Sequence, residues 1–348
     1  MSNFTVTINN VDVLVTGEGV RVGVIDTGAN ITSLSNNREH GTEGTNNWNV
    51  VAGKDFIDDE RPEIDVEGED FDAISDGNGH GEFVANQIAH PNYGVAPDAD
   101  LIIARALDDE GSGSTEGIVD AIYWCAEQGA EVINMSLGSP LYSEAMAREI
   151  QYVLESDEHD VKAVCVAVGN DRHGTRWVAS PADTLDYAIG VAAVSPDEAG
   201  EAESAYFSNI GPDDGIGDGS LGETRGANPW IAAPGMKVQT EVARPGGSHM
   251  ETDLSGTSMA CPIVAGAIAL LLENEPDLTW QEVRQRVADT AEPLPHCGVT
   301  EVGHGMIDIG NLVNDEEQDT DQESARSTSA ESRDGFHSGL GGRFFGGL

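Results

Sequence analysis

Short apolar runs alternate with helical patterns along most of this chain, and this alternation restricts its fold more than any other feature. The runs cover residues 20–25, 101–106, 131–135, 163–168, 187–194 and 230–233. Several are apolar at consecutive positions, as expected of strands that are buried on both faces of a sheet. Helical patterns lie between them, at residues 81–89, 115–128, 143–155, 258–274 and 279–290. The sequence therefore predicts an α/β fold in which helices cover both faces of a mostly parallel sheet.

Two changes in composition divide the 348 residues into three parts. Residues 1–19 precede the first strongly apolar run, and we interpret them as a short N-terminal extension. Residues 20–313 hold the predicted strands and helices and form the predicted folded domain. Residues 314–348 are first acidic and then glycine-rich, with few aliphatic side chains, so we predict a disordered tail.

The charge balance excludes several classes of partner. The chain holds 62 acidic and 17 basic residues, for a formal net charge of −45. Such a chain repels nucleic acid and anionic membranes, so we expect neither as a partner. The apolar runs argue against general disorder, and the charge instead indicates a folded protein that works in concentrated salt. At about 1 M salt the Debye length falls to about 3 Å, so like charges on the surface no longer repel each other strongly.

No export or membrane segment is recognisable in the sequence. Residues 1–20 lack a basic start, an apolar core and a twin arginine. No apolar run reaches the length that crosses a bilayer. We therefore expect a cytoplasmic location, with export by an unrecognised route as the alternative.

The chain has four cysteines: Cys125, Cys165, Cys261 and Cys297. They are too few and too scattered for a disulfide scaffold or a zinc site. The first three stand among apolar residues, so we predict buried free thiols.

Three segments place a polar residue at the boundary of a predicted element. Asp26, in VGVIDTG, ends the first apolar run, at the edge of the sheet where α/β folds hold their functional sites. His80, in GNGHG, begins a helical pattern among glycines that permit close backbone approach. Ser258, in SGTSMACPIVAG, begins a long apolar helix whose free N–H groups suit an oxyanion. Each residue alone has an ordinary explanation, as a turn residue, a polar loop residue or a helix cap.

Together these segments resemble the three catalytic blocks of the subtilisin-like serine proteases, which carry Asp, His and Ser in this chain order. The resemblance extends to GVAPDADLIIARAL at 94–107, INMSLGS at 133–139, AVGN at 167–170 and WIAAPG at 230–235. It spans roughly residues 20–310 and keeps the family's order of blocks. The fold it implies is a three-layer α/β/α domain around a central, mostly parallel sheet of about seven strands.

The resemblance implies a role for each matching residue. Ser258 is expected to be the nucleophile, His80 the general base, and Asp26 the carboxylate that orients and stabilises the imidazole. Asn170 is expected to donate a hydrogen bond from its side chain to the oxyanion. An extended peptide substrate is expected to pair with two backbone edges beside these residues. The residues of the edges and the adjoining pocket are Ser136, Leu137, Gly138, Gly111, Ser112, Gly113 and Gly169.

The leading hypothesis is a serine endopeptidase that cleaves peptides or proteins, needs no cofactor for its chemistry and is adapted to high salt. A processing protease dedicated to one partner protein is the alternative, and an inert, protease-like binding module is a third reading. We make no prediction of the oligomeric state. Two positions depart from the family's pattern, because Phe83 and Ile263 stand where the family usually has histidines. We expect these two side chains to pack together.

Residues 55–76 form an acidic segment whose carboxylates could hold a structural Ca²⁺. Asp55, Asp58 and Asp59 are the candidate ligands. Their spacing does not match an EF-hand loop. In so acidic a chain, a solvated surface loop is the favoured interpretation.

Overall fold

The computed structural model describes residues 5–8, 11–30, 49–57, 74–175, 177–184, 186–196, 202–211, 227–244 and 248–314. Apart from Asn314, the predicted tail at 314–348 lies outside the described residues. So do Asp58 and Asp59, two of the candidate calcium ligands.

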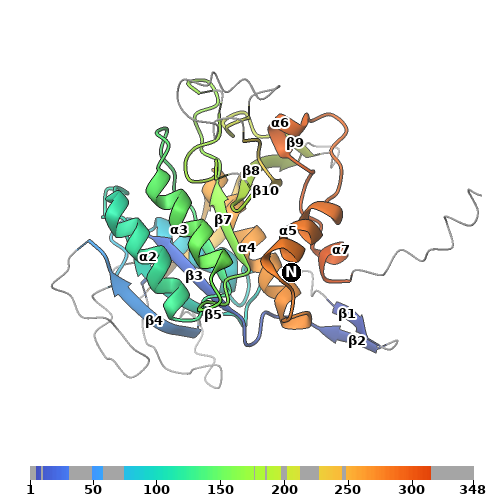
Figure 1. Ribbon diagram of the computed structural model, residues 1–348, viewed down its shortest axis with the longest axis horizontal. Coiled ribbons are helices and arrows are strands. Elements are labelled where there is room, and N and C mark those ends of the chain that lie inside the picture. The colour runs from blue at the N-terminus through green and yellow to red at the C-terminus, as the bar shows by residue number, and fades with distance from the viewer. Residues whose placement is uncertain are drawn as a thin grey trace, which may run out of the picture. The chain divides into compact units, whose positions relative to one another are not determined.

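An eight-stranded sheet runs through the centre of the fold (Figure 1). Seven strands follow the order β10-β8-β7-β6-β3-β5-β4, and each neighbouring pair is parallel. Their bounds are β3 Arg21–Asp26, β4 Asn49–Asp55, β5 Asp100–Arg105, β6 Val132–Met135, β7 Ala163–Ala167, β8 Ile189–Pro196 and β10 Ile231–Pro234. The eighth strand, β9 (Ala202–Ser204), pairs antiparallel with β8. The prediction of a mostly parallel sheet is confirmed.

β4 is a strand that the apolar pattern did not reveal. Its sequence NVVAGKD includes a glycine and a lysine, so no continuous apolar run marks it. It lies at the end of the strand order, next to β5, where one long edge has no strand beside it in the described sheet. Such a strand can be less apolar than the central strands of the same sheet.

Helices cover both faces of the sheet, and each face has its own core (Figure 1). The helices are α1 His80–Ala89, α2 Thr115–Glu127, α3 Glu144–Glu155, α4 Thr257–Asn274, α5 Trp280–Asp289, α6 Val299–Val302 and α7 Ile309–Val313. Side chains of α1 and α4 fill one core, and side chains of α2 and α3 fill the other. β3 contributes alternate residues to the two cores, Val22 and Val24 to the first and Ile25 to the second. This three-layer arrangement confirms the predicted α/β/α fold.

Two antiparallel hairpins lie outside the central sheet. The first joins β1 (Thr5–Ile8) to β2 (Val11–Leu14), before the first parallel strand. The second joins β11 (Val238–Arg244) to β12 (Ser248–Leu254), directly before α4. The side-chain amide of Gln87 on α1 donates to the Gln239 carbonyl oxygen of β11 at 3.0 Å, so the second hairpin contacts the helix that His80 begins.

α4 anchors the segment that carries Ser258. Its 18 residues are long and apolar enough to cross a membrane, by length and composition only. By these two criteria, the expectation that no apolar run is long enough to cross a membrane is wrong for α4. However, 78% of α4 is buried inside the protein, which is the pattern of a core helix.

The cysteines have the environments that the sequence predicts. Cys125, Cys165 and Cys261 are buried, Cys297 is half-buried, and all four are free thiols. Burial raises the pKa of each of the three buried thiols, because a thiolate is poorly solvated in an apolar core. These thiols therefore act as small apolar side chains.

We expect one cysteine, Cys297, to react with Ellman's reagent in the native protein, and the three buried cysteines to react only after unfolding. Counting the thiols that react with and without guanidinium chloride measures this difference. Cys297→Ser is the matched control and should remove the fast reaction. Two or more fast thiols in the native protein would contradict the packing of the core.

Candidate active site

The carboxyl ends of the parallel strands bring together segments that are far apart in the sequence. Asp26 is the last residue of β3, while β5 and β6 lead into segments 106–114 and 136–138. Neighbouring parallel strands end at the same edge of a sheet, so these segments lie side by side. His80, the first residue of α1, and Ser258, the second residue of α4, contact this edge through hydrogen bonds.

Asp26 and His80 form a pair at the end of β3. His80 Nδ1 lies 2.7 Å from Asp26 Oδ1, and Asp26 is 1% exposed. The backbone N–H of Thr27 donates to the same oxygen at 2.7 Å. The negative charge of Asp26 raises the pKa of His80 above its ordinary value of 6.5, against the opposing effect of burial. With Nδ1 directed at Asp26, Nε2 is the ring nitrogen available to a reacting group.

A second buried carboxylate, Asp76, ties the end of β3 to the start of α1. Its Oδ1 accepts hydrogen bonds from the Thr27 hydroxyl at 2.9 Å and from the backbone N–H groups of Asn78 and Gly79 at 2.9 and 2.7 Å. Its Oδ2 accepts from the Glu82 N–H at 2.8 Å. These donors lie on both sides of the aspartate–histidine pair. Asp76 therefore fixes the end of β3 relative to the start of α1, and with it the positions of Asp26 and His80. The sequence places Asp76 at the end of the acidic segment 55–76, four residues before His80, and no motif marks it as a support of the site.

The backbones of β3 and α1 also touch directly. The Thr27 hydroxyl accepts from the Gly81 N–H at 2.9 Å. A Cβ atom at Gly81 would collide with the carbonyl oxygen of Gly28. The residue after His80 must therefore be glycine, because a side chain there would push the imidazole away from Asp26.

The Ser258 hydroxyl is bonded to the substrate edge predicted from the sequence and not to His80. It donates to the carbonyl oxygen of Ser136 at 3.2 Å. The Ser136 hydroxyl in turn donates to the carbonyl oxygen of Ser258 at 2.9 Å. Catalytic hydrogen bonds are often formed only when a ligand is present. For His80 to take the proton of Ser258, the Ser258 hydroxyl must therefore leave the Ser136 carbonyl oxygen and donate to His80 Nε2 instead.

Asn170 lies beside the start of α4, where the sequence places it. Its Oδ1 accepts from the backbone N–H of Thr257 at 2.8 Å and from the Thr257 hydroxyl at 3.0 Å. These two donors fix the orientation of the amide and leave Nδ2 as its donor for a ligand. Thr257 is fully buried and also accepts from the Gly169 N–H at 3.2 Å, so Gly169 supports this arrangement. Thr257 directly precedes Ser258, but no feature of the motif predicts its contact with Asn170.

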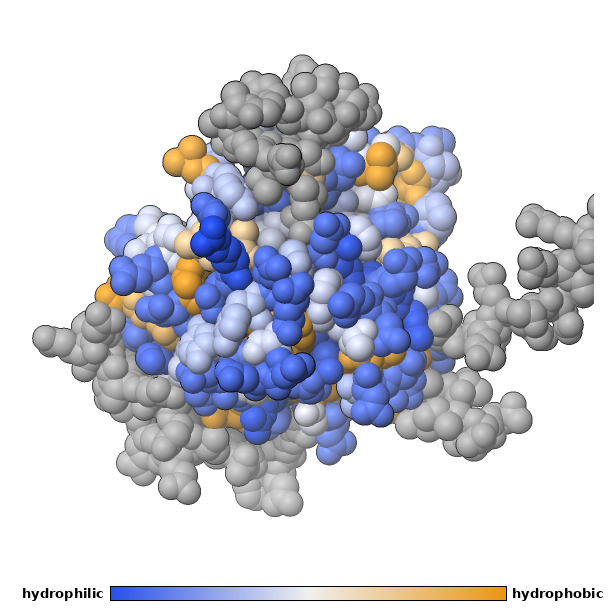
Figure 2. Space-filling model, in the orientation of Figure 1, coloured by the Kyte–Doolittle hydropathy of each residue, from blue (hydrophilic) through white to orange (hydrophobic). Residues whose placement is uncertain are grey.

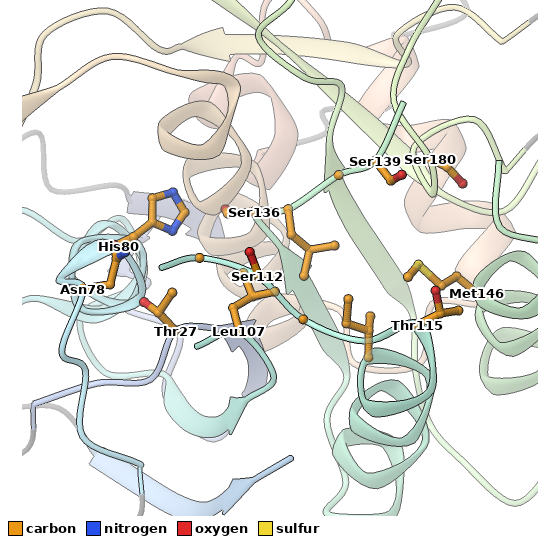
Figure 3. Close-up of a pocket in the computed structure, with 15 residues that line it drawn as sticks. Thr27, Asn78, His80, Leu107, Ser112, Thr115, Ser136, Ser139, Met146 and Ser180 are labelled. Atoms are coloured by element: carbon orange, nitrogen blue, oxygen red, sulfur yellow. The ribbon is translucent and has the colours of Figure 1, made fainter. Parts of the chain in front are cut away.

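A cleft of about 460 Å³ begins beside His80 and runs between two backbone segments (Figure 3). Residues 111–113 and 136–138 both line it, as the sequence predicts. In Figure 3, His80 and Met146 lie at opposite ends of the cleft. The fold adds further lining residues to which the sequence assigned no role, and they come from helices and loops far apart in the chain. These are Thr27, Asn78, Leu107, Thr115, Ile118, Ser139, Met146 and Ser180.

Asp55, a candidate calcium ligand, is instead part of an ion-pair network. It is 2% exposed, its Oδ2 lies 3.0 Å from Arg105 Nη1, and its Oδ1 accepts from the Ile57 N–H at 2.8 Å. Arg105 also pairs with Asp109 at 3.0 Å. Asp55 therefore differs from both predictions for its segment, because it is buried rather than solvated and pairs with Arg105 rather than standing in a group of carboxylates. Within the described ranges, no three or more His, Cys, Asp or Glu residues form a group that could hold a metal ion.

Comparisons with known proteins cover most of the chain. The family model of the subtilase family, peptidase S8, matches residues 17–331. Subtilisin DY of Bacillus licheniformis is 33% identical over 300 residues, which cover 84% of this chain and 90% of that protein. Alkaline elastase YaB of Bacillus sp. (strain YaB) is 33% identical over 297 residues, covering 84% of this chain and 64% of the relative. The solved structure of sphericase superposes with a TM-score of 0.67 and 28% identity, covering 86% of this chain and 95% of that one.

Removal of either nearby negative charge is expected to lower the pKa of His80, because both Asp26 and Asp76 favour the charged imidazole. Asp26→Asn should lower this pKa more than Asp76→Asn, since Asp26 is the stronger influence. NMR titration of the His80 ring measures both shifts. Asp277→Asn, an exposed residue that is not among the influences on His80, is the matched control. An unchanged His80 pKa in Asp26→Asn would contradict the paired geometry.

Proposed function

Because the chain belongs to the subtilase family of serine endopeptidases, we propose that it hydrolyses peptide bonds with Asp26, His80 and Ser258 as its catalytic residues. The 2.7 Å contact between His80 Nδ1 and Asp26 Oδ1 is the observation that carries the proposal. The start of α4 supports it, because this segment presents Ser258 beside the oriented amide of Asn170. The same arrangement disfavours an inert binding module, which has no need of an ordered set of these groups.

Acylation begins when the Ser258 hydroxyl leaves the Ser136 carbonyl and bonds to His80 Nε2. His80 takes the proton while Ser258 Oγ attacks the scissile carbonyl carbon and forms a tetrahedral intermediate. Asp26 stabilises the resulting imidazolium with the charge that already raises the pKa of His80. Asn170 Nδ2 and the Ser258 N–H donate to the oxyanion.

Collapse of the intermediate completes the first half of the reaction. His80 gives its proton to the amide nitrogen, the C–N bond breaks, and the amine product leaves with the acyl group still on Ser258. In the second half, His80 takes a proton from a water molecule, which attacks the acyl carbon and releases the carboxylic acid. The Ser258 oxygen recovers its proton from His80, so no cofactor enters the chemistry.

The cleft beside His80 is the proposed site for the substrate backbone. A peptide in extended conformation fits between residues 111–113 and 136–138, where main-chain groups of both segments pair with it as neighbouring strands would. The apolar side chains of Leu107, Ile118 and Met146 suit a hydrophobic side chain of the peptide. Affinity then depends on the backbone edges, and selectivity depends on the side chains that line the cleft.

Adaptation to concentrated salt is the second part of the proposal. The formal net charge is −45, and Figure 2 shows a largely hydrophilic face with hydrophobic residues in small, separate patches. Repulsion among so many carboxylates destabilises the compact state at low ionic strength, and salt screens this repulsion. A dedicated processing role is an alternative to general proteolysis, and profiling with a peptide library distinguishes the two.

Ser258→Ala is expected to abolish peptide hydrolysis and labelling by a fluorophosphonate. Asn170→Ala is expected to lower kcat by about 10²–10³-fold with little change in KM, the effect known for such a donor in this family. Active-site titration and steady-state kinetics in high salt measure both. Labelling of Ser258→Ala equal to that of the unsubstituted protein would overturn the catalytic proposal.

The midpoint of thermal unfolding is expected to rise steeply as KCl increases towards about 1 M, where screening of surface charge is nearly complete. Differential scanning calorimetry across a KCl series measures the rise. Sucrose at matched osmolarity is the control, because it is excluded from the protein surface but does not screen charge. An unfolding temperature independent of KCl, or one raised equally by sucrose, would contradict the proposed salt adaptation.

A further inference from the structure

Pro262, the sixth residue of α4, stands where the carbonyl group of Ser258 would find its helical donor. In an α-helix, the carbonyl oxygen of each residue accepts from the N–H four residues later. For Ser258 that residue is Pro262, which lies inside α4 and has no N–H. The carbonyl oxygen of the nucleophile's own residue therefore depends on a donor from outside the helical ladder.

That donor is the hydroxyl of Ser136, which belongs to the segment that follows β6. Ser136 Oγ donates to the Ser258 carbonyl oxygen at 2.9 Å. Ser136 is 3% exposed, so water competes little for this bond. The same residue also accepts from the Ser258 hydroxyl through its backbone carbonyl, at 3.2 Å. Two hydrogen bonds thus join Ser136 to Ser258, one at the backbone and one at the reacting hydroxyl.

A fully buried amide on β6 orients the Ser136 hydroxyl. Asn134 Nδ2 donates to Ser136 Oγ at 3.0 Å, and Asn134 is 0% exposed. Because Ser136 Oγ accepts from Asn134 Nδ2, its own proton is left to donate, and the Ser258 carbonyl oxygen accepts it at 2.9 Å. In the described part of the chain, Asn134 Oδ1 has no hydrogen-bond partner. A buried amide that is only half satisfied is costly in a sheet core, and an apolar residue would suit β6 better for packing alone.

We propose that Asn134 and Ser136 are positioning residues. The Ser136 hydroxyl, oriented by the Asn134 amide, supplies to the Ser258 carbonyl the hydrogen bond that the missing N–H of Pro262 would otherwise donate. The inference rests on the proposed role of Ser258 as the nucleophile. Through these two side chains, Ser258 is fixed to the sheet and to the substrate edge as well as to its own helix. The distance between the attacking oxygen and a peptide held on that edge is therefore set by the sheet. The role of the hydroxyl differs from that of the Ser136 backbone, which pairs with the substrate.

The test is a double-mutant cycle between positions 136 and 262. Ser136→Ala is expected to lower kcat by about 10- to 100-fold while KM changes little, because a small misplacement of a reacting group costs about this much and the backbone edge is kept. Pro262→Ala provides an N–H for the Ser258 carbonyl. On the Pro262→Ala background, Ser136→Ala should therefore cost about threefold or less in kcat.

The matched control is Thr290→Ala at the end of α5. The Thr290 hydroxyl also donates to a helical carbonyl, that of Arg286, at 2.8 Å, but has no contact with Ser258. We expect this variant to keep kcat and to lose only stability, which thermal unfolding measures for every variant. The proposal is overturned if Ser136→Ala keeps full kcat, raises KM alone, or loses the same factor on both backgrounds.

A second pair of variants tests the role of the hydroxyl even if Ser136→Ala does not fold. Ser136→Thr keeps the hydroxyl. Ser136→Val introduces a side chain of nearly the same shape as threonine but without the hydroxyl. We expect kcat of the threonine variant to exceed that of the valine variant by about tenfold. Equal kcat values would overturn the proposal. Ser258→Ala separates the two levels of inference, because activity in that variant refutes the catalytic proposal itself, whatever the variants at Ser136 do.

Discussion

The shared carboxyl edge of the parallel strands is the constraint on which the rest of the site depends. The strands of the central sheet are buried on both faces, and a shift of one residue would exchange the two sets of core side chains. The cores therefore fix where each strand ends. β3 lies between β6 and β5 in the strand order. Its last residue, Asp26, therefore lies beside the segments that form both sides of the cleft. The site follows from the packing of a sheet whose central part is apolar.

Polar groups that do no chemistry hold the candidate catalytic groups in position. Asp76 joins β3 to α1, Thr257 orients the amide of Asn170, and Ser136 holds the carbonyl of Ser258. All three supporting residues are buried, where hydrogen bonds are stronger than in water and the cost of breaking them is higher. Such supports keep donors and acceptors fixed before substrate arrives, which is how a site stabilises developing charge without reorganising.

The sequence predicted the layers of the fold and the main candidate residues, because both leave local marks. Buried strands appear as apolar runs, and Asp26, His80 and Ser258 stand in short motifs of glycine and small residues. The supporting residues leave weaker marks. Asp76 is one more acidic residue in a very acidic chain, and only the fold shows that its carboxylate accepts four hydrogen bonds. For the same reason Asp55 could not be told from a solvated loop residue or a calcium ligand, because its ion-pair partner, Arg105, is 50 residues away in the chain.

The backbone edges of the cleft were predicted, whereas the side chains that complete its lining and the hydroxyl contact of Ser258 depend on tertiary packing and could not be predicted from the motifs. The departures from the family pattern fall into the core. Phe83 is fully buried, and Ile263 packs partly buried against the core that α1 and α4 share. Contact between these two side chains stays a prediction. Both departures lie in the helices that present the catalytic candidates, where packing and chemistry meet.

Capture of the acyl-enzyme tests the central claim most directly. Rapid acid quench of the protein with an activated peptide ester, followed by peptide mass spectrometry, locates the covalent acyl group. We expect one acyl group per molecule, attached to Ser258, and slower acylation of the Asp26→Asn variant. Acylation at another residue, or none during ester turnover, would contradict it.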